Sequence, residues 1–140
     1  MAEEHKLHAR VLTPEGEVFE GELEQLSTKT QTGEIGILAR HVPVLARLVP
    51  SELRLHKSEG DVETYATAEG WLQVFANQAT VLVSEAIPPD ELDAGELRDR
   101  VSEAEDRLNE AEEDSAAADQ AQREKARAEA FLEIAEGGGS

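Results

Sequence analysis

The residues best suited to chemistry in this chain are its four histidines and its many carboxylates. The histidines are scattered through the first half, and His5 and His8, three residues apart, would point to opposite faces of a strand, a poor geometry for one metal ion. The chain has no cysteine, which excludes disulfides, thiolate metal sites and cysteine nucleophiles. It also lacks a G-x-S-x-G serine and a G-x-x-x-x-G-K-[ST] phosphate loop. We therefore expect no catalytic residues, no metal site and no cofactor.

One segment, GEIGILARHVPVL (33–45), has an unusual polarity pattern. Glu34 and His41 bracket a run of apolar residues, and two glycines allow a bulge or the close approach of another backbone. The simplest interpretation is a tight turn between two strands. Two sharper hypotheses remain open: a contact surface with Glu34 and His41 as polar anchors, or an enzyme that uses these two side chains as a pair.

The charge balance excludes several partners. Acidic residues outnumber basic ones by 31 to 13, giving a net charge of −18. Binding DNA or RNA needs clustered lysines and arginines, and so does docking on an anionic membrane surface. The first residues, MAEEHKLHAR, lack an apolar signal core, and no 18-residue apolar run occurs. We expect a protein with no membrane span that stays on the side of the membrane where it is made.

The composition changes at Pro88-Pro89. Residues 1–88 contain 14 acids and 7 bases, whereas residues 89–140 contain 17 acids and 6 bases in a shorter stretch. Neither proline can continue a strand ladder or stand inside a helix. We therefore predict one domain over 1–88, a second unit over 89–136, and a flexible Gly-Ser tail over 137–140.

The first unit is predicted to consist of short strands. Apolar residues alternate with polar ones, and turn signals recur at short intervals, a pattern typical of a β-sandwich or barrel. Nothing between the strands is long enough for a crossover helix, so we expect an antiparallel sheet. The whole chain is then of the α+β class. The predicted strands are 5–12, 17–20, 22–30, 34–38, 44–48, 53–57, 62–68, 71–76 and 80–87.

The second unit is predicted to be two antiparallel helices, about 90–114 and 116–136. Each has an apolar stripe at helical spacing, and Asp90 or Asp93 can cap the first helix. Alanines dominate both stripes and bury little area, so the pair should pack weakly. It is either a movable element or an ordinary solvated acidic pair. The stripes are Leu97, Val101, Ala104, Leu108 and Ala111 in the first helix, and Ala117, Ala121, Ala128, Phe131, Leu132 and Ala135 in the second.

Several motifs, in order along the chain, resemble the epsilon subunit of F-type ATP synthases. The segment GEIGILARHVPVLARL (33–48) is similar to that family's GELGI-x-x-GHAPL. The stretches LHARVLTPEGEVFEGELEQL (7–26) and AEGWLQVFANQATVLVSEAI (68–87) resemble two further family motifs. The end of the chain fits the family's helical hairpin. The resemblance covers nearly the whole chain, which makes it far more specific than a single short motif.

The resemblance implies a non-catalytic subunit at the foot of the central stalk of a proton-translocating ATP synthase. The sandwich would bind the gamma subunit and the ring of c subunits, and so help to couple proton flow to ATP synthesis. By position in the motif, Glu34 would face the c ring and His41 would lie near gamma. Such a subunit would be peripheral, at the cytoplasmic face of a bacterial cell membrane.

The resemblance also implies a regulatory role for the hairpin. In this family the hairpin can extend into the alpha/beta hexamer and block ATP hydrolysis. The basic residues Arg123, Lys125 and Arg127 interrupt an otherwise acidic segment. They are the candidates to engage acidic groups of the hexamer.

The sequence departs from the family pattern at two places. Ala39-Arg40 stands where the family commonly has Pro-Gly, and the added guanidinium can pair with an acid on gamma or on the c subunits. Family members that bind ATP on the hairpin carry [I/L]-D-x-x-R-A. Asp93 matches the aspartate of that motif, but Glu96 and Leu97 replace its arginine and alanine, which argues against a nucleotide site. A different class of function, a free-standing β-sandwich adaptor with an acidic coiled-coil tail, is the alternative.

Overall fold

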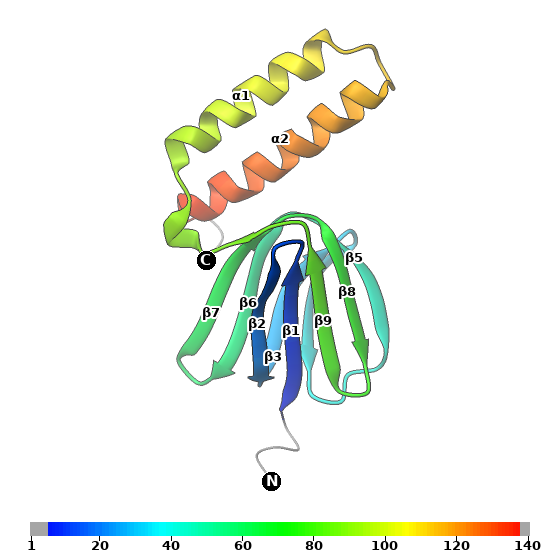
Figure 1. Cartoon of the computed structure of the whole chain (residues 1–140), viewed down its shortest axis with the longest axis vertical. Coiled ribbons are helices and arrows are strands. Elements are labelled where there is room, and N and C mark those ends of the chain that lie inside the picture. The colour runs from blue at the N-terminus through cyan, green and yellow to red at the C-terminus, as the bar shows by residue number, and fades with distance from the viewer. Residues whose placement is uncertain (1–5, 138–140) are drawn as a thin grey trace. The chain divides into compact units, whose positions relative to one another are not determined.

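The computed structural model describes residues 6–137 of the chain. The chain divides into two compact units, residues 1–88 and 89–140. Figure 1 shows that strands build the first unit and two helices the second. The predicted α+β class, a β-sandwich followed by a helical hairpin, is confirmed. Of the predicted tail at 137–140, all but Gly137 lies outside the described residues.

Ten strands make up the described part of the first unit, and they form one sheet that folds over on itself. Their order is β10-β7-β6-β3-β5-β8-β9-β1-β2, with β4 paired to β3 beside this path. Strands β3 and β5 pair only at Thr30 and Leu48, so the sheet can bend there and bring its two halves face to face. The strands are β1 (Leu7–Thr13), β2 (Gly16–Leu23), β3 (Gln25–Thr30), β4 (Gly33–Leu38), β5 (Val44–Leu48), β6 (Ser51–Ser58), β7 (Asp61–Thr67), β8 (Gly70–Phe75), β9 (Gln78–Val83) and β10 (Ala86–Ile87).

The sheet is antiparallel except for one pair of strands. Strands β1 and β9 run parallel, with His8 beside Gln78 and Leu12 beside Leu82. A parallel pair needs a long connection, which led us to expect none. Here the seven strands between β1 and β9 in the sequence serve as that connection, so no crossover helix is required.

Two strands predicted as single segments are each divided. The predicted strand 22–30 breaks at Glu24, whose backbone N–H donates to the carbonyl of His56 at 2.7 Å. Leu23 therefore ends β2 in one half of the sheet and Leu26 lies in β3 in the other, which explains why they do not alternate cleanly. The predicted strand 80–87 breaks after Val83, since β10 pairs with β7 rather than continuing β9.

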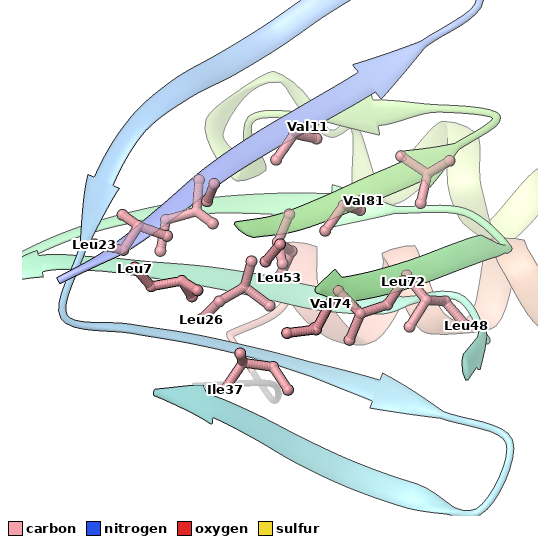
Figure 2. Packing of buried hydrophobic residues seen from close by; sticks show 14 of the residues in the cluster. Leu7, Val11, Leu23, Leu26, Ile37, Leu48, Leu53, Leu72, Val74 and Val81 are labelled. Carbon is pink, nitrogen blue, oxygen red and sulfur yellow. The ribbon is translucent and has the colours of Figure 1, made fainter. Parts of the chain in front are cut away.

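The sandwich core consists of aliphatic side chains from both halves of the sheet. Figure 2 shows that these side chains point into the space between the strands. The labelled side chains are at most 1% exposed, and each full burial of a leucine or valine is worth about 1.5–3 kcal/mol relative to exposure. The labelled residues are Leu7, Val11, Leu23, Leu26, Ile37, Leu48, Leu53, Leu72, Val74 and Val81.

The second unit is a pair of capped helices, α1 (Ala94–Glu110) and α2 (Ala116–Ala135), after a short 3₁₀ helix at Pro89–Glu91. Asp93 caps α1, because its side chain accepts a hydrogen bond from the N–H of Glu96 at 3.0 Å. Ser115 caps α2 in the same way through the N–H of Ala118 at 3.1 Å. Asp114, just before this cap, has a left-handed φ of 62° and turns the chain between the helices.

Three of the six buried residues of the hairpin seam are alanines, fewer than the pattern predicts, and its second stripe is rotated slightly. Ala117 is exposed, whereas Ile134, absent from the predicted stripe, is buried. The buried residues of the seam are Leu97, Ala104, Ala121, Ala128, Phe131 and Ile134. Within the described residues, no helix is long and apolar enough to cross a membrane.

Candidate partner-binding site

The loop 39–43 joins β4 to β5 and carries two of the predicted contact residues, Arg40 and His41. Arg40 is exposed and has a left-handed φ of 64°. The N–H of Arg40 donates to Asn77 Oδ1 at 2.8 Å, which fastens the loop to the turn between β8 and β9. His41 is half-buried; its backbone N–H donates to the carbonyl of Leu38 at 3.2 Å, and its Nδ1 lies 2.7 Å from the carbonyl oxygen of Val42.

Glu34 lies at the other end of β4 and is exposed. Its strand pairs with β3 alone, and Glu34 stands opposite Lys29. The four residue steps from Glu34 to Leu38 span about 13 Å in a strand. No hydrogen bond joins Glu34 to His41 among the described residues, so the structure does not bring them together as a catalytic pair. Glu34 and the loop instead lie at opposite ends of β4.

Next to the loop lies an apolar surface that the sequence reasoning missed. Its members occupy outward positions on β5, β8 and β9. The register places Trp71 opposite Leu82. Leu45 stands opposite Gln73, and Gln73 lies between Trp71 and Phe75 on the same face of β8. Leu45 is 71% exposed and Phe75 is 64% exposed. The available signal was the presence of large apolar residues at outward positions of these strands, where Arg47, Gln73 and Thr80 are also found. We call Leu45, Trp71, Phe75 and Leu82 the apolar outer face.

The turn between β8 and β9 centres on Ala76-Asn77, one residue before the predicted Asn77-Gln78. Phe75 pairs directly with Gln78, which leaves a two-residue loop. Ala76 and Asn77 have φ angles of 51° and 62°, as in a type I′ turn. The turn thereby presents the Asn77 side chain to Arg40.

The three basic residues of α2 do not form one exposed cluster. Arg123 is exposed, whereas Lys125 pairs with Glu105 of α1 at 3.6 Å. Arg127 is half-buried and lines a cavity of about 300 Å³ between the helices. The cavity is also lined by Arg100, Glu103, Arg107 and Glu124. An ion pair joins Arg107 of α1 to Glu124 of α2. Two of the three cations thus face α1 in this hairpin.

Asp93, the one charged residue retained from the nucleotide motif, is occupied as the cap of α1. Among residues 6–137 no group of three or more histidine or carboxylate side chains could hold a metal ion. His5 lies outside the described residues.

One polar cluster, Lys57, Glu63 and Tyr65, fastens β6 to β7. Lys57 pairs with Glu63 at 2.6 Å and also lies 5.7 Å from the ring centre of Phe19. Its hydrogen bond to Glu63 lowers the pKa of that carboxyl and raises the pKa of the Lys57 ammonium. Burial, together with the hydrogen bond donated to Glu63, raises the pKa of Tyr65 to about 12.

Both the sandwich and the hairpin lie within regions of the chain that match known proteins. The family model for the beta-sandwich domain of the ATP synthase delta/epsilon chain matches residues 6–89. The ATP synthase epsilon chain of Persephonella marina is 40% identical over 126 residues, which cover 89% of this chain and 93% of the relative. That of Halalkalibacterium halodurans is 38% identical over 99 residues, covering 71% of this chain and 74% of the relative.

Two solved structures share the fold. A chain in the mitochondrial ATP synthase of Euglena gracilis, solved with OSCP, F1 and c-ring, superposes with a TM-score of 0.79 at 20% identity, covering 90% of this chain and 79% of that one. A chain in the central stalk and c-ring of the Tetrahymena thermophila enzyme gives 0.61 at 18% identity, covering 91% and 95%.

Sandwich, hairpin and family model together define a delta/epsilon-type ATP synthase subunit. The relatives at 38–40% identity are epsilon chains. The chain belongs to the ATP synthase epsilon chain family.

Proposed function

We propose that the chain is a central-stalk subunit of a proton-translocating ATP synthase and helps to couple proton flow to ATP synthesis. The observation that carries this is the epsilon-chain relative aligned over 89% of the chain, which includes both units. Within such a complex the subunit acts through contacts rather than through catalysis. It is peripheral, held at the cytoplasmic face of a bacterial cell membrane by its partners.

The contact points divide between two partners. Glu34, exposed on a strand with a single neighbour, meets the c ring. The loop with Arg40 and His41 meets gamma. The apolar outer face is close to that loop in the chain and supports this assignment, since several large apolar residues exposed on one face mark interaction surfaces.

The hairpin restrains ATP hydrolysis by reaching the alpha/beta hexamer. Its alanine seam suits an element with two arrangements, because the two packings then differ by only a few kcal/mol. Arg123 is available to an acidic partner as the hairpin stands. Lys125 must leave Glu105 before it can engage one, and Arg127 must leave the space between the helices. Engagement of the whole basic set therefore requires α1 and α2 to separate.

The test is reconstitution of an epsilon-depleted ATP synthase with three proteins at matched assembly. These are the intact chain, a chain ending at Pro88, and a variant with Arg123, Lys125 and Arg127 changed to glutamate. All three should restore proton-coupled ATP synthesis, because the sandwich carries the gamma and c-ring contacts. ATP hydrolysis should be highest with the truncated chain and intermediate with the charge-reversed one.

Two outcomes would contradict the proposal in different ways. Failure of the intact chain to restore coupled synthesis would overturn the central-stalk role. Equal hydrolysis by all three complexes would leave the hairpin as a solvated helical pair without a regulatory role.

A further inference from the structure

Backbone strain is concentrated in one corner of the sandwich. Four non-glycine residues in the described part of the chain have a left-handed φ, and three of them, Arg40, Ala76 and Asn77, lie where the loop 39–43 meets the β8–β9 turn. This conformation is unfavourable for residues with a side chain, because Cβ crowds the backbone. Strain of this kind persists only where the surroundings enforce it, and it collects at functional contacts.

Asn77 enforces the conformation of this corner. Its Oδ1 accepts from the N–H of Arg40 at 2.8 Å, and its Nδ2 donates to the carbonyl of Lys6 at 2.8 Å. Its own carbonyl accepts from the N–H of His8 at 3.2 Å. One residue thus ties the loop, the turn and the start of β1 together. Arg40 is consequently held in one position rather than free to adapt.

Arg40 is exposed, and exposed apolar residues flank it in the sequence and in the neighbouring turn. Leu38 is 57% exposed and Val42 is 68% exposed, and Phe75, just before the turn, is 64% exposed. No hydrogen bond or ion pair of the Arg40 guanidinium occurs among the described residues. An exposed guanidinium suits a carboxylate of a partner, which it can bind through two parallel hydrogen bonds, and exposed apolar residues nearby can help to exclude water once the partner is bound.

We propose that Arg40 is a specificity-determining contact that binds a carboxylate of the gamma subunit. This inference rests on the proposed function, which places gamma at the loop. The partner is gamma rather than the c ring because the proposed function assigns the c ring to Glu34 and gamma to the loop that Asn77 fastens in place. Glu34, assigned to the c ring, lies at the far end of β4. Because the protein has a net charge of −18, most of its surface would repel an acidic partner surface. The positive charge of Arg40 would instead attract a carboxylate, and so favour docking at the loop.

The decisive variant is Arg40→Gly, because it should move stability and binding in opposite directions. Glycine adopts φ near +64° without strain, so the melting temperature of the full-length subunit should rise by a few degrees. Loss of a charge-assisted pair should weaken binding to the epsilon-free alpha-beta-gamma complex by about tenfold or more. Arg40→Ala should weaken binding equally without the gain in stability. Arg40→Lys should restore part of the affinity.

Binding is measured by biolayer interferometry with the full-length chain, and unfolding by circular dichroism. The matched control is Arg54→Ala on β6, in the other half of the sheet, which should leave the affinity unchanged. Unchanged affinity of Arg40→Gly and Arg40→Ala, with wild-type binding intact, would overturn this inference alone. Weakened binding to an isolated c ring with gamma binding unaffected would overturn the assignment to gamma. Failure of the wild-type chain to bind the complex would instead overturn the proposed function.

Discussion

The two units of this protein are stabilised in different ways. The sandwich buries leucines, valines and an isoleucine at zero or near-zero exposure and pairs its strands through backbone hydrogen bonds. The hairpin buries three alanines together with Leu97, Phe131 and Ile134. A buried alanine removes far less apolar surface from water than a buried leucine, so the hairpin gains much less from packing.

The ion pairs of the hairpin add little to its stability. Side-chain ion pairs join α1 to α2, including Arg98 with Glu136 at 2.7 Å and Arg107 with Glu124, and both pairs are exposed. Exposed ion pairs contribute only about 0–1 kcal/mol each. The comparison shows how one chain can combine a firmly packed domain with a weakly packed one. Most of the bulky residues lie in the sandwich, whereas the hairpin relies on a smaller seam and on surface charges.

The largest expected effect comes from separating the two units. A chain ending at Pro88 should unfold in one cooperative thermal transition close to that of the intact protein, because it retains the whole aliphatic core. Residues 89–140 alone should show little cooperative melting, since isolated helices of this length are marginal. Circular dichroism during heating measures both. A broad, non-cooperative transition for residues 1–88 would break the comparison.

A smaller effect is expected from one truncation in each core. Leu72→Ala, at a position with 0% exposure, should lower the free energy of unfolding of the sandwich by about 2–5 kcal/mol. Phe131→Ala should reduce the helical signal at 222 nm while the melting of the sandwich stays in place. Urea unfolding followed by Trp71 fluorescence, beside helix content, separates the two. A fall in sandwich stability with Phe131→Ala would show that the units are coupled.

The smallest expected effect is the pH dependence of the sandwich. The pKa of Tyr65 is raised to about 12, so its contribution to stability is complete below the ordinary value of 10 and is lost as the pH rises towards 12. The lowered pKa of Glu63 acts in the other direction, and its contribution is lost as the pH falls below 4.5. The Tyr65 contribution should amount to about 1–2 kcal/mol, because its hydroxyl is only partly shielded from solvent.

Tyr65→Phe is the variant that tests this pH dependence, because it removes the titrating hydroxyl and keeps the ring. Its stability should fall less than that of the wild type between pH 10 and 12, as measured by urea unfolding at each pH. An identical alkaline loss in both proteins would assign the effect to other groups.

Local patterns in the sequence were sufficient for much of the fold. Alternation and turn residues located most of the strands, and the Pro88-Pro89 break separates the segments with strand and helix periodicity. Four residues of the stripe predicted for the first helix are buried or half-buried in α1, because a regular helix places every third or fourth residue on one face, whereas Ala111 lies just beyond the end of α1. The motif that contains Glu34 and His41 also includes the loop 39–43, in which the structure leaves Arg40 exposed.

The sequence by itself determined the class of each element, the alanine seam and the motif, since these depend on neighbours along the chain. Only the tertiary structure decided the break at Glu24, the parallel pairing of β1 with β9 and the exposure of the apolar outer face. It also placed Lys125 against Glu105 and Arg40 against Asn77. These features depend on residues 20 to 70 positions apart, and no local pattern records which distant strand or helix will lie beside a given side chain.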